Sequence, residues 1–194
     1  MNRVKLIFPL IIASLILCNN CYSQDRTIYQ IINDLLKDST LKTDLVISEI
    51  NAIHKYSELL NDTAKNNGQI SPPIFGVIYY DREYFLKLVR SGLIQNEDVD
   101  YMYNQINGKY GLKLDSLLVK KRVLPMRTWQ SINERSTKKL SFIYFSNPIY
   151  VKNKESVLLS VWINDGSKLK EKTFFIKLVD GKWVISTVIL ERNI

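Results

Sequence analysis

The last quarter of the chain contains four runs of β-branched and aromatic residues that are apolar on both faces. The runs are separated by turn signals and span 140–145, 156–164, 172–179 and 182–190. In the second run, Val157 and Leu159 fall on one face while Leu158 and Trp162 fall on the other. A sheet with one face in water would carry more polar residues there. The sequence therefore predicts an antiparallel four-stranded meander whose outer face is partly covered by N-terminal helices or curled into a pocket.

The dipeptide Asp180-Gly181 alone separates the last two runs. Two-residue hairpin turns need positive φ angles, which Asp and Gly tolerate better than other residues. We therefore expect the last two strands to form a tight hairpin.

Helical spacing dominates the region before these runs. Apolar residues recur every three or four positions in 25–38, which predicts an amphipathic helix with one packed face. The same spacing in 41–60 predicts a second helix, although Leu45-Val46-Ile47 equally fits a short strand. Residues 61–73 are polar and contain Pro-Pro, which predicts a loop within one domain rather than a boundary between two domains.

Two further helices are predicted from their end signals. Asp81 can cap a helix that stops at Ser91-Gly92, and Asn96 can cap one that closes at Asn107-Gly108. Residues 111–135 are mixed, and we expect short strands and turns followed by a short helix near 129–134. The whole pattern predicts an α+β fold, with N-terminal helices packed on the C-terminal antiparallel four-stranded meander in a single domain, 24–194.

The first 23 residues have the organisation of a secretory signal peptide. Arg3 and Lys5 precede an apolar run at 6–17, and small residues at −3 and −1 place a cleavage site after Ser23. The run is shorter than the roughly 18 apolar residues of a spanning helix, so we expect no transmembrane helix in the mature chain. The predicted location is the periplasm or the medium. The alternative is a lipid anchor on Cys18, although a lipoprotein signal carries a small residue where Leu17 stands.

The composition excludes several kinds of chemistry. Cleavage after Ser23 removes Cys18 and Cys21, and with them disulfides, thiolate catalysis and cysteine-bound zinc. His54 is the only histidine, which excludes sites that need two imidazoles. The chain has seven glycines and no glycine-rich phosphate loop or calcium loop. We therefore expect no cofactor and no bound metal.

An enzyme would have to rely on carboxylates. Asp81, Glu83 and Glu134 are candidates for the acid–base pair that glycoside hydrolysis needs, but nothing in their spacing points to it. The acidic cluster at 97–100 is expected at a helix start because of the helix dipole. We lean against an enzyme and assign no catalytic residue.

Basic residues concentrate in one segment. The chain has 27 Lys+Arg, 19 Asp+Glu and a formal net charge of +8, and residues 120–139 contain seven of the cations with one acid, Glu134. One interpretation is an anionic partner: a lipid headgroup, a polysaccharide or an acidic protein. The other is a solvated connector. No nucleic acid is expected, since the chain is predicted to be exported. The candidate binding residues are Lys120, Lys121, Arg122, Arg127, Trp129, Arg135, Lys138 and Lys139. A second basic group follows at Lys168, Lys170 and Lys172.

Residues 145–150 (FSNPIY), the charged turn 153–155, the strand 157–163 and residues 180–185 (DGKWVI) together resemble a family of uncharacterised exported bacterial proteins. The resemblance covers the C-terminal part of that family and roughly the last 50 residues here, and it implies no activity. Members often carry a Cys-Gly-rich segment between the second and third of these strands. Residues 165–172 hold that place here without a cysteine, so no role of that segment carries over.

These observations predict an exported protein that binds or assists a partner without catalysis. The partner is unknown, and an exported protein or an anionic surface fits the charge. The alternative is an exported inhibitor or immunity protein against a toxin or hydrolase, and a carboxylate-based hydrolase is the third hypothesis.

We expect the mature protein isolated from its native host to begin at Gln24. Its intact mass measures this directly, because removal of residues 1–23 gives a single predicted value. A mass carrying two or three acyl chains on Cys18 would contradict soluble export and would identify a membrane-tethered protein.

Overall fold

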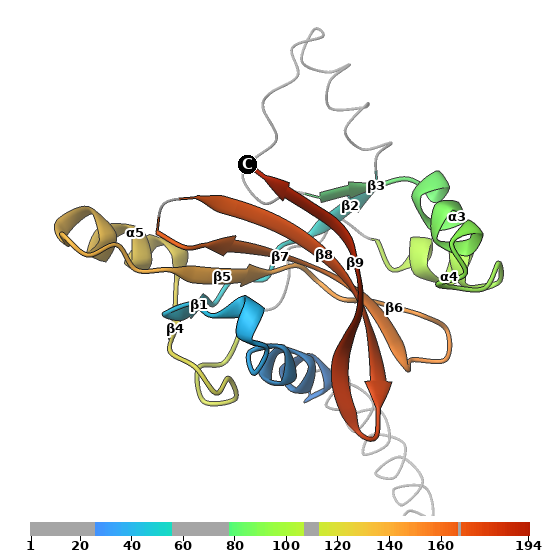
Figure 1. The fold of residues 1–194 in the computed structure, drawn as a ribbon, viewed down its shortest axis with the longest axis horizontal. Coiled ribbons are helices and arrows are strands. Elements are labelled where there is room, and N and C mark those ends of the chain that lie inside the picture. The colour runs from blue at the N-terminus through green and yellow to red at the C-terminus, as the bar shows by residue number, and fades with distance from the viewer. Residues whose placement is uncertain (1–25, 56–77, 107–112, 167) are drawn as a thin grey trace, which may run out of the picture.

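The computed structural model describes residues 26–55, 78–106, 113–166 and 168–194 and has the predicted α+β fold (Figure 1). Within these residues the main sheet has seven strands in the order β4-β1-β5-β7-β8-β9, with β6 paired to β7. They are β1 Leu45–Ile47, β4 Val123–Leu124, β5 Phe142–Phe145, β6 Ile149–Tyr150, β7 Ser156–Asn164, β8 Leu169–Val179 and β9 Lys182–Asn193. A separate parallel pair consists of β2 Ile53–Lys55 and β3 Ile78–Tyr80. The helices are α3 Arg82–Arg90, α4 Asp98–Asn104 and α5 Met126–Arg135, with helical residues 26–35 and the 3-10 turn η1 Ser39–Leu41.

The predicted meander is confirmed. Strands β5, β7, β8 and β9 are antiparallel neighbours in that order. The Asp180-Gly181 hairpin is also confirmed, with φ angles of 50° and 74° at the two turn residues. Strand β8 begins at Leu169, three residues before the predicted start, and β9 runs on to Asn193.

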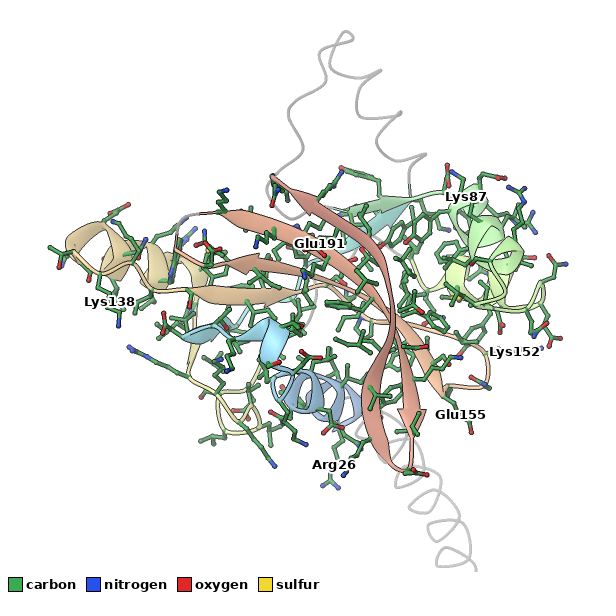
Figure 2. All side chains as sticks on the ribbon, viewed as in Figure 1. Arg26, Lys87, Lys138, Lys152, Glu155 and Glu191 are labelled. Atoms are coloured by element: carbon green, nitrogen blue, oxygen red, sulfur yellow. The ribbon has the colours of Figure 1, made fainter. Side chains whose placement is uncertain are left out.

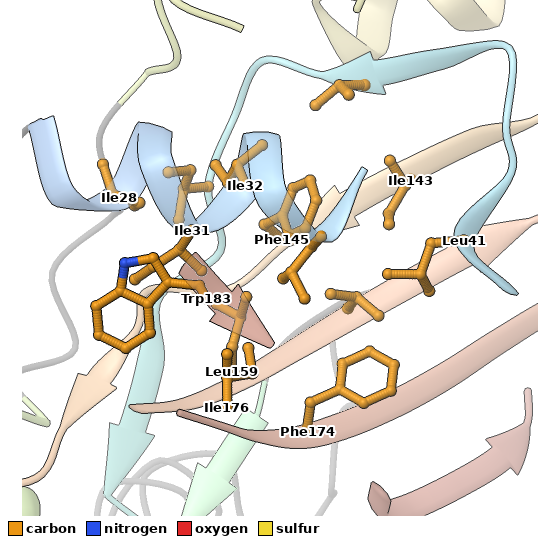
Figure 3. Packing of buried hydrophobic residues seen from close by; sticks show 14 of the residues in the cluster. Ile28, Ile31, Ile32, Leu41, Ile143, Phe145, Leu159, Phe174, Ile176 and Trp183 are labelled. Atoms are coloured by element: carbon orange, nitrogen blue, oxygen red, sulfur yellow. The ribbon is translucent and has the colours of Figure 1, made fainter. Parts of the chain in front are cut away.

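Both faces of the sheet are covered at β5, β7 and the middle of β8, whereas most of β9 is exposed, including Val184 and Val188. Helical residues 26–35 pack Ile28, Ile31 and Ile32 against one face, where they meet Phe145 and Trp183 (Figure 3). The opposite face packs against β2, β3, α3 and α4, which contribute a second buried cluster around Trp162 and Phe175. Strand β7 supplies residues to both clusters, so eight of its nine residues are buried.

The helix predicted for 41–60 is wrong over the described residues, and the alternative of a short strand at 45–47 is confirmed. Residues 45–47 form β1 and residues 53–55 form β2, and residues 56–60 lie outside the described ranges. Strand β1 runs between β4 and β5, with Val46 in one core cluster and Leu45 and Ile47 in the other. A strand buried on both faces has no polar alternation, so its apolar residues matched the helical spacing by chance. The loop predicted at 61–73 also lies outside the described ranges.

Both helices predicted after residue 80 are present, although only the first has the predicted capping residue. The Asp81 carboxylate accepts the Tyr84 amide at 2.7 Å, and Gly92 follows α3 with φ 72°. Helix α4 begins at Asp98, with Glu97 rather than Asn96 at its N-cap and no side-chain cap hydrogen bond. Asp98 is buried and accepts the amides of Gln95 and Lys152. The predicted closing signal, Asn107-Gly108, lies outside the described ranges. Helix α5, predicted near 129–134, spans 126–135.

A chain of hydroxyl groups crosses the core beside β7. The Ser160 hydroxyl lies 2.7 Å from the Thr173 hydroxyl and 3.1 Å from that of Tyr80, and Ser146 Oγ accepts the Ser160 amide. Burial raises the pKa of Tyr80, so its hydroxyl stays protonated and able to donate. These bonds satisfy polar groups that would otherwise destabilise the core.

One ion pair on the β8–β9 ladder holds a buried charge. Glu171 is buried, and its Oε2 accepts from Arg192 Nη2 at 2.7 Å and Nε at 3.0 Å. Glu171 on β8 and Arg192 on β9 stand directly opposite each other in the strand register, near the C-terminal end of β9. A buried carboxylate is tolerated only while its cation remains, so Arg192 ties the end of the chain to the sheet.

Replacing Arg192 by alanine leaves the Glu171 carboxylate buried without its cation. We expect the free energy of unfolding to fall by about 2–4 kcal/mol, measured by urea unfolding at neutral pH. The control is Glu191→Gln, which removes a charge from the half-exposed Lys172–Glu191 pair and should cost less than about 1 kcal/mol. Equal losses in the two variants would contradict this role of Arg192.

Candidate basic binding surface

The sheet topology gathers the basic segment at one end of the molecule. Strands β4, β1 and β5 are parallel neighbours, so the residues that precede them meet at one end of the sheet. The amide of Val46 donates to the Arg122 carbonyl at 2.9 Å, which places the residues before β4 beside β1. Helix α5 then returns the chain to the start of β5, and Lys138 lies on that return (Figures 1 and 2).

Asp44 ties two of these strand starts together. Its Oδ2 accepts the Ser141 amide at 2.7 Å and the Ser141 hydroxyl at 2.9 Å, while its own amide donates to the Ser141 hydroxyl at 2.8 Å. These bonds from Ser141, with the nearby charges of Lys138 and Lys121, hold the pKa of Asp44 below its usual value. Asp44 is therefore a fixed anion, already hydrogen-bonded, beside Lys121 and Lys138.

Lys121 is the most confined of these cations. Burial lowers the pKa of its ammonium group, and the charge of Asp44 offsets only part of that effect. A negatively charged ligand beside Lys121 would stabilise its charged form, as Asp44 partly does.

The seven Lys and Arg residues in 120–139 form no ion pair within the described residues. The ion pairs found there engage other cations: Lys37, Arg82, Arg90, Lys172 and Arg192. Lys139 donates to the Asn133 carbonyl at 2.8 Å and so caps the end of α5. We call the set Lys120, Lys121, Arg122, Arg127, Arg135, Lys138 and Lys139 the basic surface.

Trp129, the eighth predicted residue, packs inward. Its indole Nε1 donates to the Leu140 carbonyl at 3.0 Å, and its ring meets Phe142 edge-on with centroids 4.6 Å apart. It is half-buried and anchors α5 to β5. Its role in this structure is to position the cations of α5.

Lys168 and Lys172, from the second basic group, lie in different surroundings. A Cβ built on Gly166 would lie 3.5 Å from the Lys139 Cβ, so the turn between β7 and β8, where Lys168 is exposed, lies against the basic surface. Lys172 instead pairs with Glu191 at 3.0 Å. The turn therefore places one more cation, Lys168, beside the basic surface.

The carboxylates considered for catalysis are not brought together. Asp81 caps α3, and Glu83 on the same helix pairs with Arg90 at 2.7 Å. Glu134 lies on α5, at the other end of the molecule (Figure 1). His54 lies on β2, not on a helix, with its ring 5.5 Å from that of Tyr79. Among the described residues, no group of three His, Cys, Asp or Glu is placed to hold a metal ion.

One hollow, of about 350 Å³, lies between the end of the first helix and the start of β9. Two carboxylates line it, and both are engaged. Asp34 accepts from Lys37 and from the Trp183 amide at 3.0 Å, and Asp38 accepts the amide and hydroxyl of Thr40. Burial raises the pKa of Asp34, but these hydrogen bonds and the charges of Lys37 and Lys182 outweigh it, so the pKa is lowered. The hollow therefore holds no free acid–base pair.

Sequence reasoning missed Leu117 and Leu118, which are exposed beside the basic surface. The available signal was an apolar pair three residues before the run Lys120-Lys121-Arg122, in a segment rich in turn residues. It also missed Asp44 and Ser141, since their contact joins residues 97 positions apart.

A comparison with known protein families, with curated protein sequences and with solved structures finds no match for this chain. The resemblance of the C-terminal residues to exported bacterial proteins therefore stays a prediction. The described helices include none that is long and apolar enough to cross a membrane.

Asp44 gives the stability a measurable dependence on pH. A carboxylate whose pKa is lowered in the folded state contributes stability above the unfolded pKa of about 3.9 and loses it as the pH falls through the folded pKa. We expect Asp44→Asn to reduce the unfolding free energy by about 1 kcal/mol or less at pH 7, because water screens this exposed group. The difference from the wild type should begin to shrink as the pH falls below about 4 and should vanish once the pH is below the lowered pKa of Asp44 in the folded state.

Urea unfolding over this pH range measures the effect. Glu134→Gln is the control, since Glu134 is exposed on α5 and its loss should leave the stability unchanged. A difference between Asp44→Asn and the wild type that stays constant down to low pH would contradict the assigned role of Asp44.

Proposed function

We propose that this protein is an exported, non-catalytic binding protein that holds an anionic partner on its basic surface. The observation that carries the proposal is that Lys121, before β4, and Lys138, before β5, both lie near Asp44, at the end of the sheet where three parallel strands begin. None of the seven cations of the basic surface forms an ion pair among the described residues. Cations held close together repel one another, and a bound anion relieves that repulsion.

Two features of the site support a built surface rather than a solvated connector. The cations come from three segments, the loop before β4, helix α5 and the turn before β5, which the fold brings together. Asp44, which lies near Lys121 and Lys138, accepts its hydrogen bonds from Ser141 and holds the two strand starts in place. An anionic partner would therefore contact cations that flank strand starts held together by these hydrogen bonds.

Export rests on the predicted signal peptide at 1–23. An exported protein meets anionic lipid headgroups, polysaccharides and acidic proteins, all of which match the charge of the basic surface. The absence of a convergent carboxylate pair among the described residues favours binding over hydrolysis.

A charge-reversal experiment tests whether the basic surface or the net charge governs binding. The variant Lys120→Glu/Arg127→Glu/Lys138→Glu reverses three exposed cations of the basic surface. Its control, Lys87→Glu/Lys152→Glu/Lys177→Glu, reverses three exposed cations elsewhere and has the same net charge. Figure 2 shows Lys87 and Lys152 at the end of the molecule away from Lys138.

We expect the first variant to bind heparin, a soluble sulfated polysaccharide, about tenfold or more weaker than the wild type at low salt. The control variant should lose much less, because its charges lie far from the bound polyanion. Elution salt from a heparin column and titration in solution both measure the difference. Equal losses in the two variants would overturn the proposal.

A further inference from the structure

The turn before the basic surface carries two leucines that point into solvent. Leu117 is 90% exposed and Leu118 is 50% exposed, and Leu117 is the most exposed large apolar side chain among the described residues. The residues on either side, Leu114 and Val119, are both buried in the core. Residues 115–118 therefore lie outside the core, and Leu117 and Leu118 project into solvent.

Hydrogen bonds hold this turn in shape. The Asp115 carboxylate accepts the Leu117 amide at 2.9 Å, and the Asp115 amide donates to the Tyr29 hydroxyl at 2.9 Å. Asn33 donates to the Leu118 carbonyl at 2.8 Å and accepts the Lys120 amide at 2.7 Å. Two side chains of the first helix thus fix the turn on both sides, so the exposure of the leucines is part of the folded structure and not a frayed loop.

Cations follow the leucines at once. Lys120, Lys121 and Arg122 come directly after Val119 and belong to the basic surface. An apolar tip beside cations matches the interface of a bilayer, where acyl chains take the apolar groups and phosphates take the charges.

We propose that this turn inserts Leu117 and Leu118 into the surface of a lipid bilayer with anionic headgroups, while Lys120 to Arg122 bind lipid phosphates. The inference rests on the proposed function and names the partner of the same surface as a lipid surface. A soluble polysaccharide offers no apolar phase for the leucines. Two side chains also fall far short of the roughly 800 Å² that each partner buries in a stable protein interface. A bilayer needs only a shallow apolar insertion supported by charge.

Quenching by brominated lipid reports the depth of a single side chain. We would place a tryptophan at the tip with Leu117→Trp and, as a matched control, at the far end of the molecule with Lys87→Trp on α3. Both variants are made in the full chain, so any membrane tether provided by residues 6–17 is common to both. Emission of the unsubstituted chain is subtracted, since it already contains Trp129, Trp162 and Trp183.

The vesicles contain equal parts of phosphatidylglycerol and phosphatidylcholine with brominated acyl chains. We expect the emission of Leu117→Trp to shift to the blue and to be quenched, and that of Lys87→Trp to keep its wavelength and intensity. Adding Lys120→Glu/Arg122→Glu to Leu117→Trp should remove the quenching, as should vesicles of brominated phosphatidylcholine alone. Far-UV circular dichroism confirms that each variant is folded.

The contrary outcomes are distinct. Absence of quenching at position 117 on vesicle-bound protein, or equal quenching at 117 and 87, would overturn insertion of the turn. Quenching that persists undiminished with Lys120→Glu/Arg122→Glu would overturn the role of the cations. Failure of insertion together with the expected heparin result leaves the proposed function standing with a soluble anionic partner, whereas equal heparin losses in the two triple variants overturn the proposed function itself.

Discussion

Burial of both faces of one sheet is the constraint on which the structure depends. Strand β7 carries apolar side chains in both directions and contributes to two separate core clusters. Each face needs its own cover, because exposed side chains such as Trp162 or Phe145 would lose their hydrophobic stabilisation. The first helix supplies one cover, and the layer of β2, β3, α3 and α4 supplies the other.

The topology of the same sheet also determines where the basic residues of 120–139 lie. Strands β1 and β4 add to β5 in parallel, which places three strand starts at one end of the sheet. Parallel neighbours need crossover connections, and α5 is the connection that returns the chain to β5. Lys121 and Lys138 are separated by this helix in sequence, but both lie near Asp44. The same arrangement that completes the sheet therefore creates the basic surface.

The first helix connects the two features of the candidate site. Its apolar side packs on the sheet, while Tyr29 and Asn33 hold the turn that carries Leu117 and Leu118. The exposed leucines and the adjacent cations are thereby fixed to the core and cannot fold back without breaking these bonds. A rigid apolar tip costs less conformational entropy when it inserts than a flexible loop would.

Local pattern by itself determined the elements whose signals lie within a few residues: the meander, the Asp180-Gly181 hairpin, the first helix and the ends of α3. It also located the basic segment, because charge can be counted along the chain. Only the tertiary structure decided that 45–47 and 53–55 are strands, that Trp129 packs inward and that Leu117 and Leu118 project from a fixed turn. A short strand buried on both faces has no periodicity that distinguishes it from a helix. The exposure of a leucine likewise depends on partners such as Tyr29 and Asn33, more than 80 residues away, which no local pattern contains.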